Sequence, residues 1–383
     1  MMSVESDHAL HARFSVEYRL TGTEPEARAR AEALCLEQTV EMPDEFLPSG
    51  PFREQILGRV ERFRPLTGST HEAVVSFPSE LVGDDLTQLL HVVFGIASLK
   101  PGLRVHRLHL PEAMLTRWPG PLHGCAGLRD LVGTHDRPLV CGVLKPLGLP
   151  AGDLATLAYQ FARGGLDLIK DDQGLADHSF CRFEDRVSQC AAAVARANRE
   201  TGGRCRYLPH VTGPWDIMRR RCLFAKQVGA GGVVVCPGLT GFDAVRDIAQ
   251  DDDVGLPIVT HPNFLGSYVV HETGGIAPAV LFGQLPRLAG ADASIYPSYG
   301  GGFPMTPADC RAVGAAATEA WGHLHPMFPT AAGRMSLDRV REVGDFYSGD
   351  VIIIVGTECA RPGHDVVETC RSFIREASRC GTR

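Results

Sequence analysis

The sequence has no long apolar run, no paired-cysteine motif and no excess of basic residues, and each absence excludes a class of protein. No stretch approaches the ~20 apolar residues that span a bilayer. The formal net charge of -7 argues against nucleic acid or an anionic membrane as a partner. The opening residues, "MMSVESDHALHARFSVEYRL", lack the apolar region of a signal peptide. We therefore expect a cytoplasmic protein.

The twelve cysteines are scattered and include no CxxC pair. In a long chain without a secretory signal, most cysteines are expected to be reduced and structural, and these spacings do not favour zinc. Cys141 and Cys236 lie in apolar runs, where a free thiol behaves as a small hydrophobic side chain.

The chain has 383 residues, which predicts one large domain and a smaller one. Within residues 1–130, residues 13–20 alternate like a strand and residues 24–39 carry helix formers. Residues 71–78 predict another strand and residues 84–98 another helix. A β-α-β-β-α order predicts a small α+β domain.

Over residues 131–383 the pattern changes, because short apolar runs alternate with helix-like stretches and each run ends in a polar, glycine or proline cluster. The eight runs are "PLVCGVLKP", "LDLIKDD", "RYLPHVTG", "GGVVVCPGL", "LPIVTHP", "ASIYPSYG", "HPMFPTAAG" and "DVIIIVGT". Eight such runs predict a (β/α)8 barrel, with a doubly wound sheet as the alternative. Active sites of barrels form where the strands end. The residues at these ends are Lys145, Lys170 to Gln173, His210, Thr240, His261, Tyr296, Gly333 and Gly356.

The stretch "IKDDQ" ends the second run and allows two interpretations. Lys170, Asp171 and Asp172 form either a polar turn or a set of groups that converges on a metal ion. Lys145 ends the neighbouring run. Two ammonium groups side by side repel each other, and this repulsion lowers the pKa of at least one of the two lysines. A neutral lysine serves as a base or reacts with carbon dioxide to form a carbamate, which together with Asp172 would bind Mg2+.

Other strand ends predict substrate contacts. His261 is a candidate acid/base or substrate-binding group, with packing as the alternative. His210 has weaker support, because a shift of one residue would turn it away. The last two runs end in "AAGRM" and "IVGTE". Loops after strands seven and eight of barrels often bind phosphate, and here Gly333, Arg334, Gly356 and Thr357 are the candidates, with two ordinary turns as the alternative.

These motifs resemble those of the RuBisCO large chain. "GGLDLIKDDQ" is similar to its metal-site motif, and "VLKPLGL" to its first barrel segment. "CLEQT" and "VVFG" are similar to its N-terminal motifs, "GLTGF" to its fourth-strand segment, and "AAGRM" and "IVGTE" to its phosphate turns. The resemblance covers nearly the whole chain in the same order.

The resemblance implies a ferredoxin-like α+β domain followed by the TIM barrel, in a homodimer whose active sites form between subunits. It implies one Mg2+ per subunit, bound by carbamylated Lys170 and by Asp172, with Lys145 as the acid/base lysine. Glu37 and Thr39 are the N-terminal residues that it brings to the site.

The departures from the family pattern are informative. The third metal ligand, normally glutamate, is Gln173, which binds without charge. Pro262 replaces the arginine after the fifth-strand histidine, Ala332 replaces a serine, and the loop after the sixth strand lacks its lysine. Bisphosphate carboxylation is therefore not expected. The chain resembles the RuBisCO-like, form-IV branch, and most of all its subgroup that acts on 3-oxo-isoapionate 4-phosphate.

Three functions follow as expectations. The first is a Mg2+-dependent lyase or transferase that decarboxylates, transcarboxylates or hydrolyses a phosphorylated 3-oxo sugar acid. The second is an enolase or isomerase of the methionine-salvage type, acting on a methylthio sugar phosphate. The third is a catalytically degenerate binding protein.

Overall fold

The computed structural model describes residues 12–359, 361 and 363–380, which form two compact units. The first unit comprises the described residues up to Pro119 together with Leu265–Gln284, and the second comprises the rest. Residues 1–11, where the absence of a signal segment was expected, lie outside this part of the chain. None of the described helices has the length and apolar character needed to cross a membrane.

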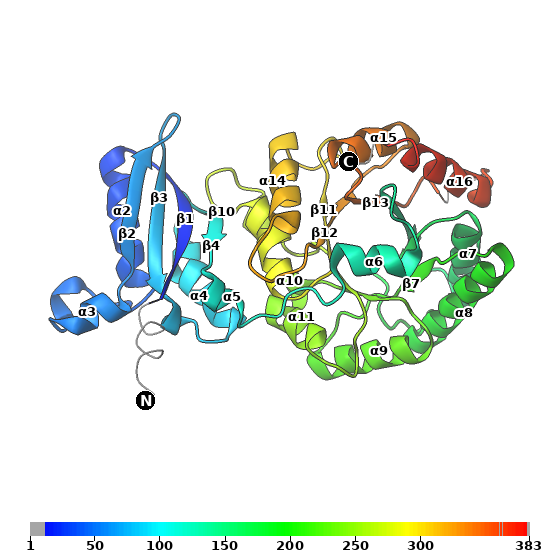
Figure 1. Ribbon diagram of the computed structural model, residues 1–383, viewed down its shortest axis with the longest axis horizontal. Coiled ribbons are helices and arrows are strands. Elements are labelled where there is room, and N and C mark those ends of the chain that lie inside the picture. The colour runs from blue at the N-terminus through cyan, green and yellow to red at the C-terminus, as the bar shows by residue number, and fades with distance from the viewer. Residues whose placement is uncertain (1–11, 360, 362, 381–383) are drawn as a thin grey trace. The chain divides into compact units, whose positions relative to one another are not determined.

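The first unit is a sheet with helices packed on one face (Figure 1). Its strands run in the spatial order β10-β4-β1-β3-β2. They are β1 (Arg13–Thr21), β2 (Arg59–Pro65), β3 (Thr70–Pro78), β4 (Leu103–His109) and β10 (Gly275–Ile276). Its α-helices are α2 (Glu24–Glu37), α3 (Pro51–Ile56), α4 (Leu86–Phe94), α5 (Glu112–Leu115) and α12 (Gly266–Val269). Its other helical turns are η1 (Asp44–Phe46), η2 (Ser79–Leu81), η3 (Ile96–Leu99) and the π-helix η4 (Ala279–Gln284). The order β1-α2-β2-β3-α4-β4 is ferredoxin-like, as predicted.

The segment 265–284 belongs to the first unit although its sequence position is between two barrel strands. Its short strand β10 pairs in parallel with β4, and the Gln284 amide bonds both Leu108 N and Leu108 O, at 2.9 and 2.8 Å. Gly275 has φ +87°, and a Cβ there would lie 2.1 Å from Tyr268 O, so only glycine fits. The expected division into 1–130 and 131–383 differs from these units, because residue 130 lies inside α6 (Gly124–Val132) and 265–284 was assigned to the barrel.

The second unit is the predicted (β/α)8 barrel, and all eight predicted runs form its strands. They are β5 (Leu139–Leu144), β6 (Leu168–Asp171), β7 (Arg206–Leu208), β8 (Val233–Val235), β9 (Ile258–Thr260), β11 (Ala293–Pro297), β12 (Phe328–Ala332) and β13 (Ile352–Val355). The parallel sheet runs β7-β6-β5-β13-β12-β11-β9-β8. His210 forms a parallel bridge with Val234, which joins β7 to β8 and completes the ring. This closure excludes the doubly wound alternative.

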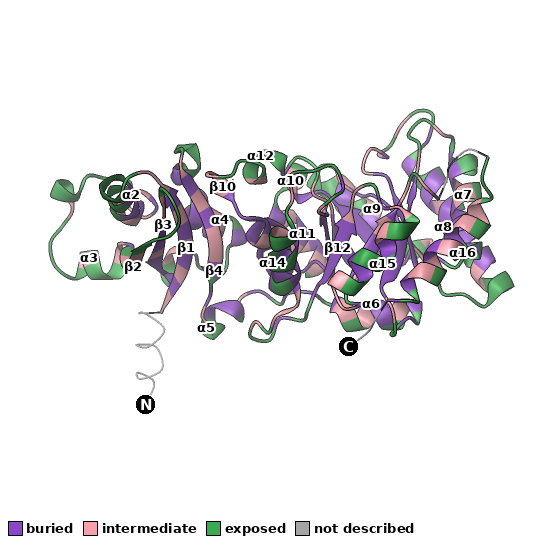
Figure 2. Ribbon diagram, turned by 90° about the horizontal axis from the view of Figure 1, so that it is seen from above, coloured by how far each residue is buried: buried purple, intermediate pink, exposed green. Residues whose placement is uncertain are grey.

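Helices surround the ring, and their outer faces are exposed while the strands are buried (Figure 2). Besides α6, they are α7 (Ala151–Arg163), α8 (Phe183–Thr201), α9 (Trp215–Gln227), α10 (Pro237–Thr240), α11 (Phe242–Ala249), α13 (Leu285–Leu288), α14 (Pro307–Thr318), α15 (Leu337–Phe346) and α16 (Val366–Ala377). Alternate strand residues fill the interior, and Leu128 and Val132 of α6 join this core. All twelve cysteines lie in the described part and are free thiols.

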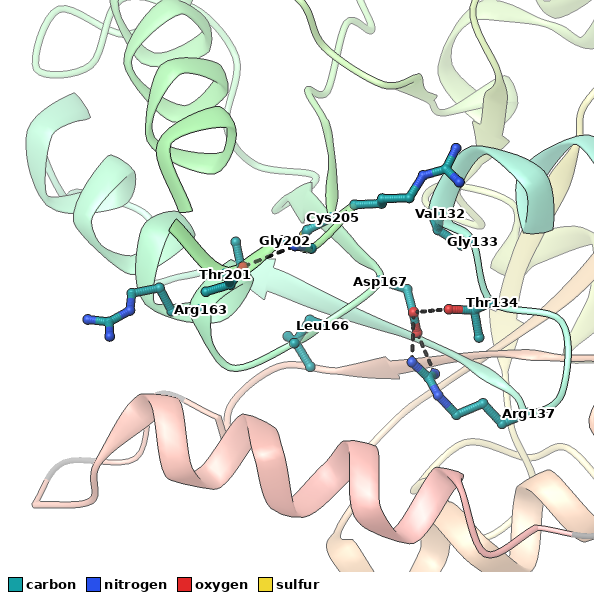
Figure 3. Close-up of a pocket in the computed structure, with 14 residues that line it drawn as sticks. Val132, Gly133, Thr134, Arg137, Arg163, Leu166, Asp167, Thr201, Gly202 and Cys205 are labelled. Carbon is teal, nitrogen blue, oxygen red and sulfur yellow. Dashed lines mark hydrogen bonds and ion pairs between the residues drawn. The ribbon is translucent and has the colours of Figure 1, made fainter. Parts of the chain in front are cut away.

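The amino ends of β5, β6 and β7 surround a pocket of about 350 Å3 (Figure 3). Asp167 lies in it and accepts two bonds from Arg137, at 2.7 and 2.9 Å. Thr134 Oγ1 and Val140 N bond the same carboxylate at 2.9 and 2.8 Å. Because the carboxylate is buried and its bonds are all satisfied, this pocket serves the fold, at the end of the barrel opposite the predicted site.

Asp167→Ala should lower the free energy of unfolding by about 3 kcal/mol, because it leaves a largely buried guanidinium without its partner. Urea unfolding followed by circular dichroism measures this. The matched control is Asp130→Ala, at an exposed carboxylate that lies 3.6 Å from His135, and it should change stability by less than about 0.5 kcal/mol. Equal midpoints for the two variants would contradict this account of the pocket.

Candidate active site at the carboxyl end of the barrel

The barrel interior changes from apolar to polar toward the carboxyl ends of its strands. Leu168, Leu208, Val234 and Val259 belong to the interior core. Side chains two residues further along a strand point to the same face. The residues two positions beyond these core residues are Lys170, His210, Cys236 and His261. A ring of titratable groups therefore caps the apolar core, and Asp172 lies two positions beyond Lys170.

Asp171 faces the opposite side of β6 and is not part of this ring. Its carboxylate is fully buried and accepts bonds from Arg186 Nε at 3.0 Å, Tyr207 Oη at 2.7 Å and His210 N at 3.1 Å. The interpretation that Lys170, Asp171 and Asp172 all converge on one ion is therefore wrong for Asp171. Strand alternation makes it a structural partner of α8.

Lys145 and Asp172 meet at the ends of the adjacent strands β5 and β6. Lys145 Nζ lies 2.9 Å from Asp172 Oδ2, with side-chain exposures of 44% and 11%. Oδ2 is buried and accepts no hydrogen bond from the described residues, so the contact is an ion pair without hydrogen-bond geometry. The other oxygen, Oδ1, accepts a bond from Gly174 N at 3.0 Å. Asp172 is thus held by one oxygen, while the second faces Lys145.

Lys170 is the buried member of the lysine pair. Its side chain is almost wholly inside the barrel, and Nζ donates to the carbonyl oxygen of Asp171 at 2.8 Å. Burial lowers the pKa of Lys170, and the charge of Lys145 lowers it further, whereas Asp172 opposes the shift. One of the two lysines thus has the lowered pKa that the sequence predicts.

His210 and Cys236 face each other across the seam of the barrel, where β7 meets β8. Cys236 Sγ lies 3.3 Å from His210 Nε2, and His210 Nδ1 lies 3.1 Å from the carbonyl oxygen of Leu175. A carbonyl only accepts, so Nδ1 carries the proton and Nε2 accepts from the thiol. Burial lowers the pKa of His210 to about 4. Sequence reasoning missed Cys236, because its apolar neighbours indicate packing. Cys236 lies two residues after Val234, which faces the barrel interior, and this spacing is the signal that could have found it.

His261 begins the loop after β9 and is half-buried. Its backbone N donates to Val235 O at 2.8 Å, and its Nδ1 accepts from Asn263 N at 3.2 Å. The neutral ring therefore carries its proton on Nε2. Burial, followed by the charges of Lys170, His210 and Lys145, holds the pKa of His261 well below its ordinary range. His261 is suited to donate a hydrogen bond as a neutral group.

The predicted phosphate residues follow two paired strands, β12 and β13. Gly333 has φ +108° and Arg334 φ +43°, and the turn packs against Gly301. Gly356 is half-buried and Thr357 is exposed. Because β13 also pairs with β5, these turns are next to the end of β5, where Lys145 lies. The strand order thus brings the phosphate candidates and the lysines to one side of the barrel.

Other predicted residues lie elsewhere. Tyr296 points away from the interior, and its hydroxyl donates to that of Tyr347, the residue that follows α15. Tyr296 does lie near the carboxyl end of β11, as expected, but its side chain faces outward because the interior residues of this strand are Ala293 and Ile295. Thr240 lies in α10, where its hydroxyl bonds the carbonyl oxygen of Cys236 at 3.3 Å. Glu37 and Thr39 lie at the end of α2 in the first unit.

The residues after β6 fit a hard divalent cation. The Oδ2 atom of Asp172 is a buried carboxylate oxygen that accepts no hydrogen bond from the described residues and faces Lys145 Nζ at 2.9 Å, and the Gln173 side chain is half-buried. Such oxygens are the ligands that Mg2+ prefers. No three His, Cys, Asp or Glu side chains of the described residues gather to hold a metal ion, so Lys170 would have to supply a ligand as a carbamate.

Comparisons with known proteins agree with this architecture. Residues 124–302 match the family model described as the ribulose bisphosphate carboxylase large chain, catalytic domain. Ribulose bisphosphate carboxylase-like protein 1 of Rhodopseudomonas palustris is 37% identical over 96% of this chain and 98% of its own length. 5-Methylthioribulose-1-phosphate isomerase of Rhodospirillum rubrum is 36% identical over 97% of this chain and 98% of its own length. The crystal structure of a Rubisco-like protein from Rhodopseudomonas palustris superimposes with a TM-score of 0.88, at 35% identity over 97% of this chain and 99% of that one.

The buried His210 predicts a pH dependence of stability. Its pKa in the folded state, about 4, lies below the ~6.5 of an unfolded histidine, so the unfolded chain binds the extra proton between these values. The free energy of unfolding should therefore fall as the pH drops from 6.5 toward 4, by about 1.4 kcal/mol per pH unit for this group.

Chemical denaturation of the wild type and of His210→Gln between pH 4.5 and 7.5 measures this contribution. The variant should have the shallower pH slope. His135→Gln changes an exposed histidine outside the barrel interior and serves as the control, with an expected slope like that of the wild type. A slope unchanged in His210→Gln would show that the imidazole is not held neutral.

Proposed function

The chain belongs to the ribulose bisphosphate carboxylase large-chain family, in its RuBisCO-like branch, and from this premise we propose that it acts on a phosphorylated 3-oxo sugar acid. The reaction forms an enediolate by decarboxylation, transcarboxylation or hydrolysis of the acid. The observation that carries the proposal is the meeting of Lys145, Lys170 and Asp172 at two adjacent strand ends. The turns that we propose bind phosphate follow β13, which pairs with β5, and β12, which pairs with β13.

Mg2+, one per subunit, would supply Lewis-acid polarisation of the substrate's carbonyl and hydroxyl oxygens. Lys170, Asp172 and Gln173 are the residues that would hold it. The lowered pKa of Lys170 supports its carbamylation, because the unprotonated amine is the form that attacks carbon dioxide. The new nitrogen–carbon bond forms with loss of one nitrogen-bound proton, and the product is an anionic oxygen ligand.

Lys145 moves the proton at the reacting carbon. Its Nζ is held by Asp172 at 2.9 Å, which fixes the amine at the mouth of the barrel. His261 directly follows β9, which is four positions from β5 in the ring of eight strands and so on the opposite wall. From there its Nε2–H donates a hydrogen bond to a substrate oxygen as a neutral group. The turns at Gly333 and Gly356 bind the phosphate through backbone N–H groups.

The neutral side chain of Gln173 favours a substrate that brings its own carboxylate. The family pattern has a charged glutamate at this position, so this site has one negative charge fewer. A 3-oxo acid restores that charge, because its carboxylate is a hard oxygen ligand next to the reacting carbon. The same substitution disfavours substrates that carry no carboxylate beside the ketone.

A second candidate substrate is a methylthio sugar phosphate. Its support is the relative named 5-methylthioribulose-1-phosphate isomerase, which is 36% identical over nearly the whole of both chains. The isomerisation needs the same proton transfer next to a carbonyl group, and in addition an apolar surface for the thioether. Gln173 argues against this substrate, because a methylthio sugar phosphate has no carboxylate that would restore the missing negative charge.

Homodimerisation is part of the proposal. Large apolar side chains are exposed on the loops or helix starts that follow six barrel strands, and such a rim indicates a protein interface. They are Leu147, Phe180, Trp215, Leu239, Phe264 and Phe303. A second copy of the chain would cover this rim and bring Glu37 and Thr39 to the site.

Turnover of 3-oxo-isoapionate 4-phosphate with Mg2+ and bicarbonate tests the proposal. Lys170→Ala and Lys145→Ala should each reduce kcat by roughly 10^3-fold, because each removes a group that acts on the reacting atoms. Lys226→Ala is the matched control: this lysine donates to Asp253 O at 2.7 Å on the outer side of the barrel, so its kcat should be that of the wild type.

Full activity in both active-site variants would defeat the scheme. Turnover of 5-methylthioribulose 1-phosphate in place of the acid would establish the second candidate. No turnover of either substrate by the folded wild type would favour the degenerate binding protein.

A further inference from the structure

The end of α2 is fixed by the side chain of Gln38. Its Oε1 accepts from Ala97 N at 2.9 Å, and its Nε2 donates to His91 O and Val92 O, both at 2.9 Å. Gln38 is only 3% exposed, so these bonds are sheltered from water. The amide therefore ties the residues at the end of α2 to the turn η3.

This arrangement places Glu37 beside Lys100. Lys100 follows η3 directly, and its Nζ donates to Glu37 Oε1. The second carboxylate oxygen, Oε2, is buried and has no hydrogen-bond partner among the described residues. Glu37 is thus held by one oxygen, and the other is available as an acceptor. A buried carboxylate oxygen left unpaired is costly, so a partner for it is expected.

We propose that Lys100 is a positioning and specificity-determining residue that presents Glu37 to an anionic substrate. The inference rests on the proposed function and on the proposed homodimer, in which Glu37 reaches the partner's barrel. Lys100 holds Oε1, and Oε2 accepts a hydroxyl group of the substrate. Lys100 also neutralises the charge of Glu37, which would otherwise repel a substrate that carries both a phosphate and a carboxylate.

The absence of a lysine from the loop after β11 agrees with the proposed role of Lys100. The loop after β11, "SYGGGFPM", contains no lysine, and the family resemblance implies one there. A cation close to Glu37 is instead supplied by the same unit as the glutamate. It is in place before substrate binds and needs no loop closure.

The surroundings of the pair are those of a surface that becomes covered. Leu99, next to Lys100, is 78% exposed. An exposed apolar side chain beside a fixed charged pair indicates a protein contact. Burial in the homodimer would strengthen the Glu37–Lys100 attraction, because the local dielectric constant falls.

A purely structural role for Lys100 is the competing explanation. Glu37 is the last residue of α2, where the helix dipole disfavours a negative charge, and Lys100 offsets that charge. Such a role would affect the stability of the unit and leave ligand affinity unchanged. The two explanations therefore differ in what they predict for Kd and KM.

The test compares Lys100→Met, Lys100→Arg and the control Lys226→Met in the full-length protein. KM and kcat are measured with 3-oxo-isoapionate 4-phosphate. Kd is measured by calorimetry with 4-phosphoerythronate, an inert phosphorylated sugar acid, and folding is checked by the melting temperature. Lys100→Met should raise KM and Kd about fivefold and change kcat by less than about twofold, since a partly exposed charge pair is lost.

Two further variants sharpen the result. Lys100→Arg keeps the charge and should retain affinity within about twofold of the wild type. Adding Glu37→Gln to Lys100→Met should recover much of the lost affinity, because the uncompensated charge is removed. Lys100→Met should raise KM less for 5-methylthioribulose 1-phosphate, which has no carboxylate, than for 3-oxo-isoapionate 4-phosphate.

Unchanged KM and Kd in Lys100→Met would overturn the inference, and so would an equal loss in Lys226→Met or in Lys100→Arg. A lower melting temperature with unchanged Kd would assign Lys100 a structural role and also overturn it. Failure of the proposed function has a different signature: the wild type itself then neither turns over the acid nor binds 4-phosphoerythronate.

Discussion

Side chains alternate between the two faces of a β-strand, and this alternation on β6 determines the chemistry of the barrel. Lys170 continues the interior row that begins at Leu168, while Asp171 faces outward to Arg186 and Tyr207. The Asp171 carboxylate also accepts a hydrogen bond from His210 N, so it anchors the end of the neighbouring strand β7 as well. A stretch of three charged residues thus divides into a structural group and a chemical pair, Lys170 and Asp172.

The two lysines at the mouth of the barrel have different surroundings: Lys145 is paired with a carboxylate, and Lys170 is buried away from solvent. Lys145 pairs with Asp172, whereas burial lowers the pKa of Lys170. Around them the histidines are neutral: His210 accepts from a thiol, and His261 carries its proton on Nε2. The site therefore combines an amine whose pKa is lowered by burial with two neutral imidazoles that take part in hydrogen bonds.

Much of the fold could be predicted because its signals are local. Each barrel strand is a short apolar run with a polar end, and the ring order follows once eight such runs are recognised. The return of 265–284 to the first sheet could not be predicted, since β10 has two residues and its contacts with β4 are distant in sequence. For the same reason sequence patterns did not reveal the Cys236–His210 pair or the Glu37–Lys100 pair: each joins residues that only the folded chain brings together.

Calorimetric titration of Mg2+, with and without bicarbonate, tests the central claim most directly, namely that Lys170 and Asp172 form a metal site of the carbamate type. The account predicts that the wild type binds Mg2+ only when bicarbonate is present, and that Gln173→Glu binds it more tightly because a charged ligand is added. The same titration of Lys170→Ala should show no binding. Binding by Gln173→Glu alone, with none by the wild type under either condition, would contradict the account and place the loss of metal chemistry at Gln173.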